Sequence, residues 1–252
     1  MRRCTRSTLL LLLLLCAAHL TRCRDLPQYI KACSEKDPNM SECALKNGRA
    51  AIPYVVKGDP SIKLLPQDPL KVTEIVVDEK GLKFTMRDVV IRGEAKGDLQ
   101  DARCGESRSF PSERRLELDV WFPVLDMSFK YNVSGKVLVL PLDGAGTGTM
   151  KLENVTIHYK INYEPYRNGD TDHIKATVAQ SRGEIGHMAL NLQNLFNGDK
   201  FLGDNTNKVL NENWEVLVGD VGPAMFESFR AVAQNLVDTI FDGVPYRKVI
   251  LE

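Results

Sequence analysis

Apolar side chains recur at every third or fourth position between Val221 and Phe241, near the C-terminal end of the chain. At about 100° per residue they cover roughly half of a helix's circumference, which is wider than a single coiled-coil seam. Pro223 suits a first helical turn, and Asp242 with Gly243 suits a helix end. The pattern predicts a long helix over 221–241 that other elements must wrap. Its first apolar row is Met225, Phe229, Val232, Leu236 and Ile240.

A long central region instead alternates apolar and polar residues, which is the pattern of half-buried strands. A change of phase near Asp88 predicts a β-bulge. The glycine-rich run 143–148 and residues 168–170 predict tight turns. The continuously apolar residues 136–142 predict a strand that is covered on both faces. The clearest alternation is in 114–122, where one face carries Leu116, Leu118, Val120 and Phe122.

The remaining segments complete the predicted order of elements. Residues 41–56 have a helical pattern that begins at Ser41 and is bent or divided at Pro53. Residues 183–196 suit a strand or an irregular segment, and 197–213 are polar. The absence of β-α-β alternation argues against a doubly wound parallel sheet. We therefore predict an α+β fold in which a strongly curved antiparallel β-sheet wraps the long C-terminal helix, with a short N-terminal helix.

The N-terminal residues 1–23 have the pattern of a secretory signal peptide. Arginines precede an unbroken run of leucine from Leu9 to Leu15, which is too short to span a membrane. Cleavage after Cys23 and cleavage after Ala18 both fit the sequence. No later stretch approaches 18 consecutive apolar residues, so we expect a secreted, extracellular protein without stable membrane insertion.

Removal of residues 1–23 changes the charge balance of the chain. The full sequence has 33 basic and 33 acidic residues, and the segment 1–23 contains four arginines and no acid. The mature chain then has 29 basic residues against 33 acidic ones, a net charge of −4. A mildly acidic secreted protein has no electrostatic reason to bind nucleic acid or an anionic membrane.

Cysteine usage is consistent with an oxidising compartment. Cys33 and Cys43 lie ten residues apart around a turn-rich segment, so we expect them to form a disulfide. Cys104 is unpaired if cleavage follows Cys23, and it has Cys23 as a candidate partner if cleavage follows Ala18. The spacing of Cys33 and Cys43 has no companion pair of Cys or His, so we expect no zinc or other metal site.

The sequence offers sites for modification but no recognised catalytic motif. Sequons at Asn39, Asn132 and Asn154 are candidate glycosylation sites in a secreted chain. A G-x-S-x-G elbow, an H-E-x-x-H motif and a dinucleotide fingerprint are all absent. We therefore expect neither an enzyme nor a protein with a cofactor.

Several short motifs, spread in order over the whole mature chain, resemble the insect takeout and juvenile-hormone-binding protein family. They are the lead-in 26–30 with Cys33, Asp37-Pro38 and Cys43, the segments 57–61 and 64–70, Tyr131 and Gly135, the run 140–146, Asn213-Trp214, the terminal helix, and 241–245. The resemblance implies a single domain over 24–252 with the tubular lipid-binding fold. The absence of cysteine after Cys104 is similar to the takeout branch rather than to hormone-binding members from moths.

The resemblance also implies a secreted carrier for juvenile hormone, another terpenoid or a lipid-like molecule, held in an apolar tunnel beside the helix. We predict that the tunnel is lined by one row of the helix and by aromatic residues of the facing strands. Tyr131 is expected to offer its hydroxyl to a ligand oxygen. The predicted lining is Phe84, Trp121, Phe129, Tyr131, Met225, Phe229, Val232, Leu236 and Ile240.

An alternative hypothesis is an extracellular interaction or signalling protein with a filled core. The charged segment 101–115 would then provide the contact surface, and the nine residues above would be ordinary core. The two hypotheses differ in whether apolar side chains enclose an empty volume, which periodicity does not reveal. The sequence leaves the oligomeric state open.

Overall fold

The computed structural model of the protein describes residues 24–106, 114–137 and 140–251. The predicted signal peptide, Cys23 and the centre of the charged segment 101–115 lie outside the described residues. The strands are β1 (Cys33–Ser34), β2 (Leu70–Glu79), β3 (Leu82–Arg92), β4 (Asp98–Glu106), β5 (Arg114–Val137), β6 (Leu140–Asn168), β7 (Thr171–Leu192) and β8 (Ile250–Leu251). The helices are α2 (Met40–Lys57), α3 (Lys200–Glu212), α4 (Trp214–Phe241) and α5 (Tyr246–Val249), with short turns η2 (Pro60–Ile62), η3 (Glu94–Lys96) and η4 (Phe196–Gly198).

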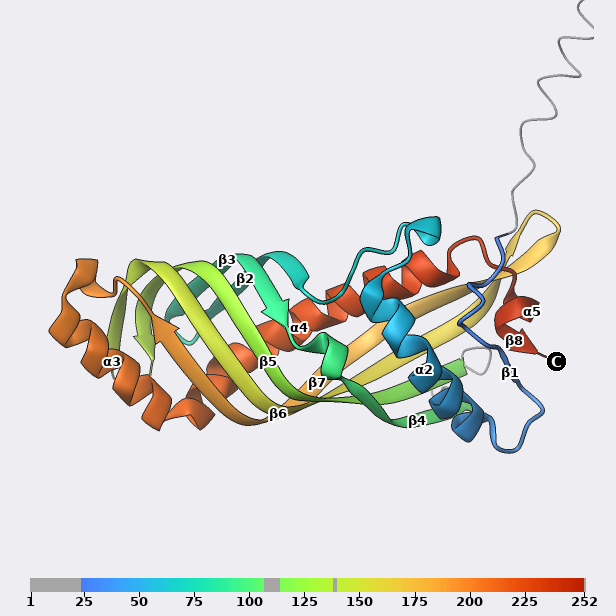
Figure 1. Cartoon of the computed structure of the whole chain (residues 1–252), viewed down its shortest axis with the longest axis horizontal. Coiled ribbons are helices and arrows are strands. Elements are labelled where there is room, and N and C mark those ends of the chain that lie inside the picture. Colours follow the sequence, from blue (N-terminus) through green and yellow to red (C-terminus); the bar gives the residue numbers. More distant parts are fainter. Residues whose placement is uncertain (1–23, 107–113, 138–139, 252) are drawn as a thin grey trace, which may run out of the picture.

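One antiparallel sheet with the order β2-β3-β5-β6-β7 forms most of the molecule, and β4 pairs with the free part of β5. Its long strands curl around α4, which runs diagonally through the molecule (Figure 1). β5 pairs with β4 along its first half and with β3 along its second half. This one strand therefore runs through both the part of the sheet that contains β4 and the part that contains β3. The prediction of a strongly curved antiparallel sheet around a long C-terminal helix is confirmed.

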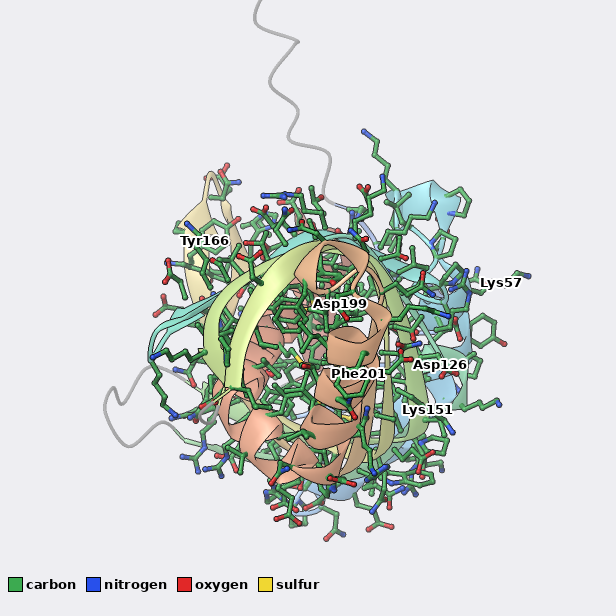
Figure 2. The ribbon with its side chains drawn as sticks, turned by 90° about the vertical axis from the view of Figure 1, so that its left-hand side faces the viewer. Lys57, Asp126, Lys151, Tyr166, Asp199 and Phe201 are labelled. Carbon is green, nitrogen blue, oxygen red and sulfur yellow. A yellow bond between two sulfur atoms is a disulfide. The ribbon has the colours of Figure 1, made fainter. Side chains whose placement is uncertain are left out.

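The alternation of residue types along the strands separates the inside of this sheet from the outside. Viewed along the long axis, the sheet curls around the helices, and Asp126 and Lys151 lie on its outer surface (Figure 2). These two residues are register partners on β5 and β6, and both are exposed. Their neighbours Leu125 and Leu152 point inward and are almost fully buried. A period of two residues is therefore enough to assign each face.

Side-chain amides protect the outer edge of β7. Asn211 Nδ2 donates to Leu190 O at 2.7 Å, and Leu190 N donates to Asn211 Oδ1 at 2.8 Å. Asn207 makes the same pair of bonds with Leu192, both at 2.9 Å. Farther along, Val178 N donates to Gln234 Oε1 at 2.7 Å. Helices α3 and α4 thus satisfy backbone groups that an open sheet edge leaves unpaired.

Asn211→Ala should lower the free energy of unfolding by about 2 kcal/mol, because the buried N–H and C=O of Leu190 lose their partners. Chemical denaturation followed by circular dichroism measures this change. Asn205→Ala is the matched control, because Asn205 is exposed and its Nδ2 donates to Phe201 O in the same helix. We expect the control to cost less than about 0.5 kcal/mol. Equal effects of the two substitutions would contradict an edge-capping role for Asn211.

Three predicted elements differ from the structure. Helix α4 begins at Trp214 rather than at Val221, so Pro223 lies inside the helix. Residues 200–212, predicted only as a polar segment, form α3. The predicted strand over 136–142 is instead the end of β5 and the start of β6. In α4 and α3 the buried side chains of Leu217 and Leu210 pack into the core, and this packing outweighs local propensity.

The glycine run 143–148 is also not a turn, because it lies inside β6. An ideal Cβ at Gly146 would lie 2.3 Å from Gln193 O, and one at Gly148 would lie 2.4 Å from Phe129 Cε2. The glycines therefore serve a close approach of neighbouring groups to the strand. The bulge near Asp88 is confirmed by the register shift between Arg87 and Val90, and the turn at 168–170 is confirmed by the end of β6 at Asn168.

Candidate ligand-binding site

The burial of helix α4 changes along its length. In its first half Val221 and Met225 are buried in the main core, and Phe229, just past the middle, is buried at the border between this core and the second half. In its second half Val232 and Leu236 are only partly buried, although they continue the same apolar rows. Their remaining accessible area faces a cavity. One apolar surface of α4 thus packs a solid core at one end and lines an open volume at the other.

The cavity has a volume of about 450 Å³, which lies within the roughly 300–1,000 Å³ typical of small-molecule sites. Its lining residues come from α2, from the second half of α4, and from β4, β5, β6 and β7. The disulfide between Cys33 and Cys43, with an S–S distance of 2.03 Å, ties the segment before α2 to that helix. The predicted pairing of these cysteines is therefore confirmed, and Cys33 itself lines the cavity.

Four of the nine residues predicted to line a tunnel lie at this cavity: Phe229, Val232, Leu236 and Ile240. All four belong to α4. They occupy consecutive positions of one apolar row, so the cavity extends along more than three turns of the helix. Any role of these residues in ligand contact remains a proposal.

The structure places the other five predicted lining residues elsewhere. Met225 is fully buried in the main core. Phe84 packs edge-on against Phe129 and Tyr131, with ring centroids 6.1 and 6.0 Å apart. The Tyr131 hydroxyl, predicted to serve a ligand oxygen, donates instead to Gln193 O at 2.8 Å. These side chains fill the half of the sheet that closes tightly around the first half of α4.

Trp121 is the fifth residue, and it does not line the cavity because it lies on the opposite face of β5. Its Nε1 donates to Asn154 Oδ1 at 2.7 Å. The next residue, Phe122, lines the cavity instead, together with Leu116, Leu118 and Val120. The alternation along 114–122 already placed Phe122 on the face of these three residues, so this signal was present in the sequence.

Two further groups of lining residues were not predicted. On β6, Ile157, Tyr159 and Ile161 contribute to the cavity wall, and their spacing of two residues marks a shared face. Helix α2 contributes Ala44, Gly48 and Ala51 among others. Because these side chains are small, the backbone of α2 can lie close to the strands that form the rest of the cavity wall. The sequence pattern identified this helix but did not show what it would face.

Among the described residues that line the cavity, Glu94 is the one with an acidic side chain. Both of its carboxyl oxygens are buried and have no hydrogen-bond partner on another residue of the described chain. Burial raises the pKa of this carboxyl to about 7, and the nearby charge of Asp68 acts in the same direction. Contact with the backbone N–H of Glu94 itself opposes the shift without cancelling it. The carboxyl is therefore held against the cavity at a cost in stability.

Raising the pH from 5 to 8 should destabilise the wild type relative to Glu94→Gln. The folded state raises the pKa of Glu94 from 4.5 to about 7, so the unfolded chain ionises first. The contribution of the protonated carboxyl to the free energy of unfolding is fully present below the unfolded pKa. It is lost as the pH rises through the folded pKa, by up to about 3 kcal/mol. Denaturation of both proteins at both pH values measures the difference. Parallel pH dependences would exclude a raised pKa at Glu94.

Cys104 also lines the cavity and is a free cysteine. Its backbone N–H donates to Ser41 Oγ at 2.9 Å, which joins β4 to the start of α2. Burial raises the pKa of its thiol, so the unreactive protonated form dominates near neutral pH. Because Cys23 lies outside the described residues, pairing between Cys23 and Cys104 stays untested.

The three sequon asparagines, Asn39, Asn132 and Asn154, all have exposed side chains. Asn132 Oδ1 accepts a hydrogen bond from Arg87 Nη1 at 3.0 Å, and Asn154 bonds to Trp121 as described above. An attached glycan would point away from the cavity at Asn132 and Asn154, which lie on the outer face of the sheet. Glycosylation itself stays a prediction.

The histidines lie on different parts of the molecule. His158 Nδ1 lies 2.7 Å from Asp119 Oδ1 between neighbouring strands, whereas His187 packs edge-on against Trp214. His173 is buried beside Tyr166. Within the described ranges, no three His, Cys, Asp or Glu side chains are grouped as they would be around a metal ion. None of the described helices combines the length and the apolar character that a membrane span requires.

Comparisons with known proteins give consistent matches. The family model described as haemolymph juvenile hormone binding protein matches residues 9–251. The circadian clock-controlled protein daywake of Drosophila melanogaster is 28% identical over 233 residues, which cover 87% of this chain and 86% of the relative. Daywake of Drosophila yakuba is 25% identical over 233 residues with the same coverage.

Among solved structures, Takeout 1 of Epiphyas postvittana is similar with a TM-score of 0.69 at 22% sequence identity. The match covers 88% of this chain and 100% of that chain. At this identity the similarity shows a shared fold: a curled antiparallel sheet around a long C-terminal helix.

Proposed function

The chain belongs to the haemolymph juvenile hormone binding protein family, and from this membership and the cavity we propose that it is a secreted carrier of a small hydrophobic ligand. The proposed ligand class comprises juvenile hormone, other terpenoids and lipid-like molecules. The cavity of about 450 Å³ beside the second half of α4 is the observation that carries the proposal.

The composition of the cavity wall supports a binding protein rather than an enzyme. Most lining side chains are aliphatic or aromatic, and the polar ones are few. Sites of this kind gain affinity from apolar burial and orient their ligand with a small number of polar groups. The hydroxyl of Tyr163 and the carboxyl of Glu94 are such groups in the wall.

The proposal of secretion is supported by the signal-peptide pattern and by the disulfide between Cys33 and Cys43, because disulfides persist in oxidising compartments. The alternative of a surface interaction through 101–115 depends on residues 107–113, which the structure does not describe. The cavity favours the carrier, since a filled core would leave no such volume.

Native mass spectrometry of the protein secreted from insect cells, followed by organic extraction, tests the proposal. We expect a co-purified apolar molecule, or uptake of one from a panel of terpenoids and fatty alcohols. A ligand-free mass with no uptake from that panel would overturn the carrier function. The same spectrum gives the mature N-terminus, and so decides between cleavage after Ala18 and after Cys23.

A further inference from the structure

Glu94 is a poor residue for an apolar wall if its only role is structural. Its two carboxyl oxygens are buried with no partner from the other described residues, and an unpaired buried carboxyl costs free energy in either protonation state. Leucine, which is of similar size, would avoid this cost. A polar group supplied by a bound ligand would satisfy the same oxygens.

The surroundings of Glu94 determine which ligand group fits. Tyr159 also lies in the cavity wall, where burial raises the pKa of its phenol and the nearby Glu94 charge acts in the same direction. Asp68 Oδ2 accepts from the backbone N–H groups of the two residues that flank Glu94, from Gly93 N at 3.2 Å and from Ala95 N at 3.0 Å. The Asp68 carboxylate is thus held at the turn that carries Glu94, and its charge helps to raise the pKa of Glu94.

Among the described residues that line the cavity, Lys31 is the one with a positively charged side chain. Its side chain is exposed on the N-terminal segment, and no ion pair joins it to Glu94 within the described chain. A negatively charged ligand head would therefore meet Glu94 and Asp68 without a neutralising partner at that point of the wall. This arrangement disfavours free fatty acids.

Hydrogen-bond capacity narrows the choice further. An ionised carboxyl only accepts hydrogen bonds, whereas a protonated carboxyl donates one and accepts others. A ligand hydroxyl both donates and accepts, so it pairs with Glu94 in either state. An ester or ether oxygen only accepts, and it pairs with Glu94 only in the protonated state. An ammonium head would have to be buried as an ion pair at a high desolvation cost.

We propose that Glu94, beside Tyr159, is the polar anchor of the cavity and selects apolar ligands that carry a hydroxyl group over ligands that carry a carboxylate. This inference rests on the proposed carrier function and specifies the chemistry of its ligand. The apolar chain would extend from Glu94 along Val232 and Leu236 of α4.

Competition against the fluorescent probe N-phenyl-1-naphthylamine tests the inference with ligands that share one alkyl chain. The set is 1-dodecanol, its methyl ether, dodecanoate and dodecylamine. At a pH of about 8, where a carboxyl with a pKa of about 7 is mainly ionised and cannot donate to an ether, we expect the wild type to bind the alcohol about tenfold more tightly than the ether or the carboxylate, as expected for one hydrogen bond to a carboxyl. In Glu94→Leu this preference should fall to about twofold or less, with each ligand compared against that variant's own affinity for the probe.

Glu94→Gln should reduce the preference for the alcohol over the ether, because an amide always offers a donor to the ether oxygen, and it should bind dodecanoate better than the wild type. Glu184→Gln, on an exposed glutamate of β7, is the matched control and should leave all affinities unchanged. An unchanged alcohol preference in Glu94→Leu would overturn the anchor role. Tightest binding of dodecylamine by the wild type would overturn the hydroxyl assignment.

A measurement of stability separates anchoring from a structural role. We expect the ligand-free Glu94→Leu protein to melt at a higher temperature than the wild type, because the unpaired carboxyl is gone. A lower melting temperature would identify Glu94 as a structural residue and overturn the inference. Failure of the carrier function looks different, since the wild type would then bind neither the probe nor any of the four ligands.

Discussion

Met225→Ala should lower the free energy of unfolding by about 2–5 kcal/mol, whereas Leu236→Ala, on the same helix, should lower it by less than about 1.5 kcal/mol. Both residues belong to one apolar row of α4. Met225 is fully buried, so its truncation leaves a void among tightly packed neighbours. Leu236 already faces open volume, so its truncation removes fewer contacts and merely enlarges the cavity.

Ligand affinity should respond in the opposite way. Leu236→Ala removes apolar contact area from the proposed ligand and should weaken binding about tenfold, while Met225→Ala should leave affinity within about twofold of the wild type. Chemical denaturation and probe titration on the same three proteins measure both quantities. Equal losses of stability and no loss of affinity at Leu236 would identify it as ordinary core.

Ala233→Trp should reduce probe affinity about 100-fold, which corresponds to about 2.8 kcal/mol of binding free energy. Ala233 lines the cavity, so an indole at this position would occupy much of the volume of about 450 Å³ that a ligand needs. Because the space is open, the larger side chain should cost little stability. Overpacking a filled core, by contrast, typically costs about 1–3 kcal/mol.

The same change at Ala231 controls for the general effect of tryptophan on α4. Ala231 lies two residues earlier and is exposed to solvent, so Ala231→Trp should leave both affinity and stability close to those of the wild type. If Ala233→Trp instead unfolds the protein and retains no binding in its folded fraction, the cavity is not open in solution. Thermal denaturation alongside probe titration distinguishes these outcomes.

Local sequence patterns were sufficient for the main elements of the fold. The wide apolar rows of 221–241 predicted a helix that needs a surrounding sheet, because a helix with half its surface apolar has to be covered. Strand alternation predicted the inward face of 114–122, since side chains alternate with a period of two. Cys33 and Cys43 predicted the disulfide because of their short separation and the turn between them. The motifs of the family, spread over the chain, agreed with all three.

The predictions failed where distant segments decide the conformation. Trp214 and the residues after it are helical although Pro223 suggested a later start, because Leu217 packs into the core beneath the sheet. Gly146 and Gly148 looked like a turn, yet they allow close contact between β6 and groups of Gln193 and Phe129. Neither contact leaves a trace in the local sequence.

The sequence by itself determined that α4 has a continuous apolar surface and that the facing strands are apolar on one side. Only the tertiary structure decided that this surface is packed around Met225 and open around Leu236. An empty volume depends on how strongly each part of the sheet curves and on which side chains reach across, and periodicity carries neither quantity. The position of Glu94 has the same origin, because a short turn between β3 and β4 places its carboxyl in the wall.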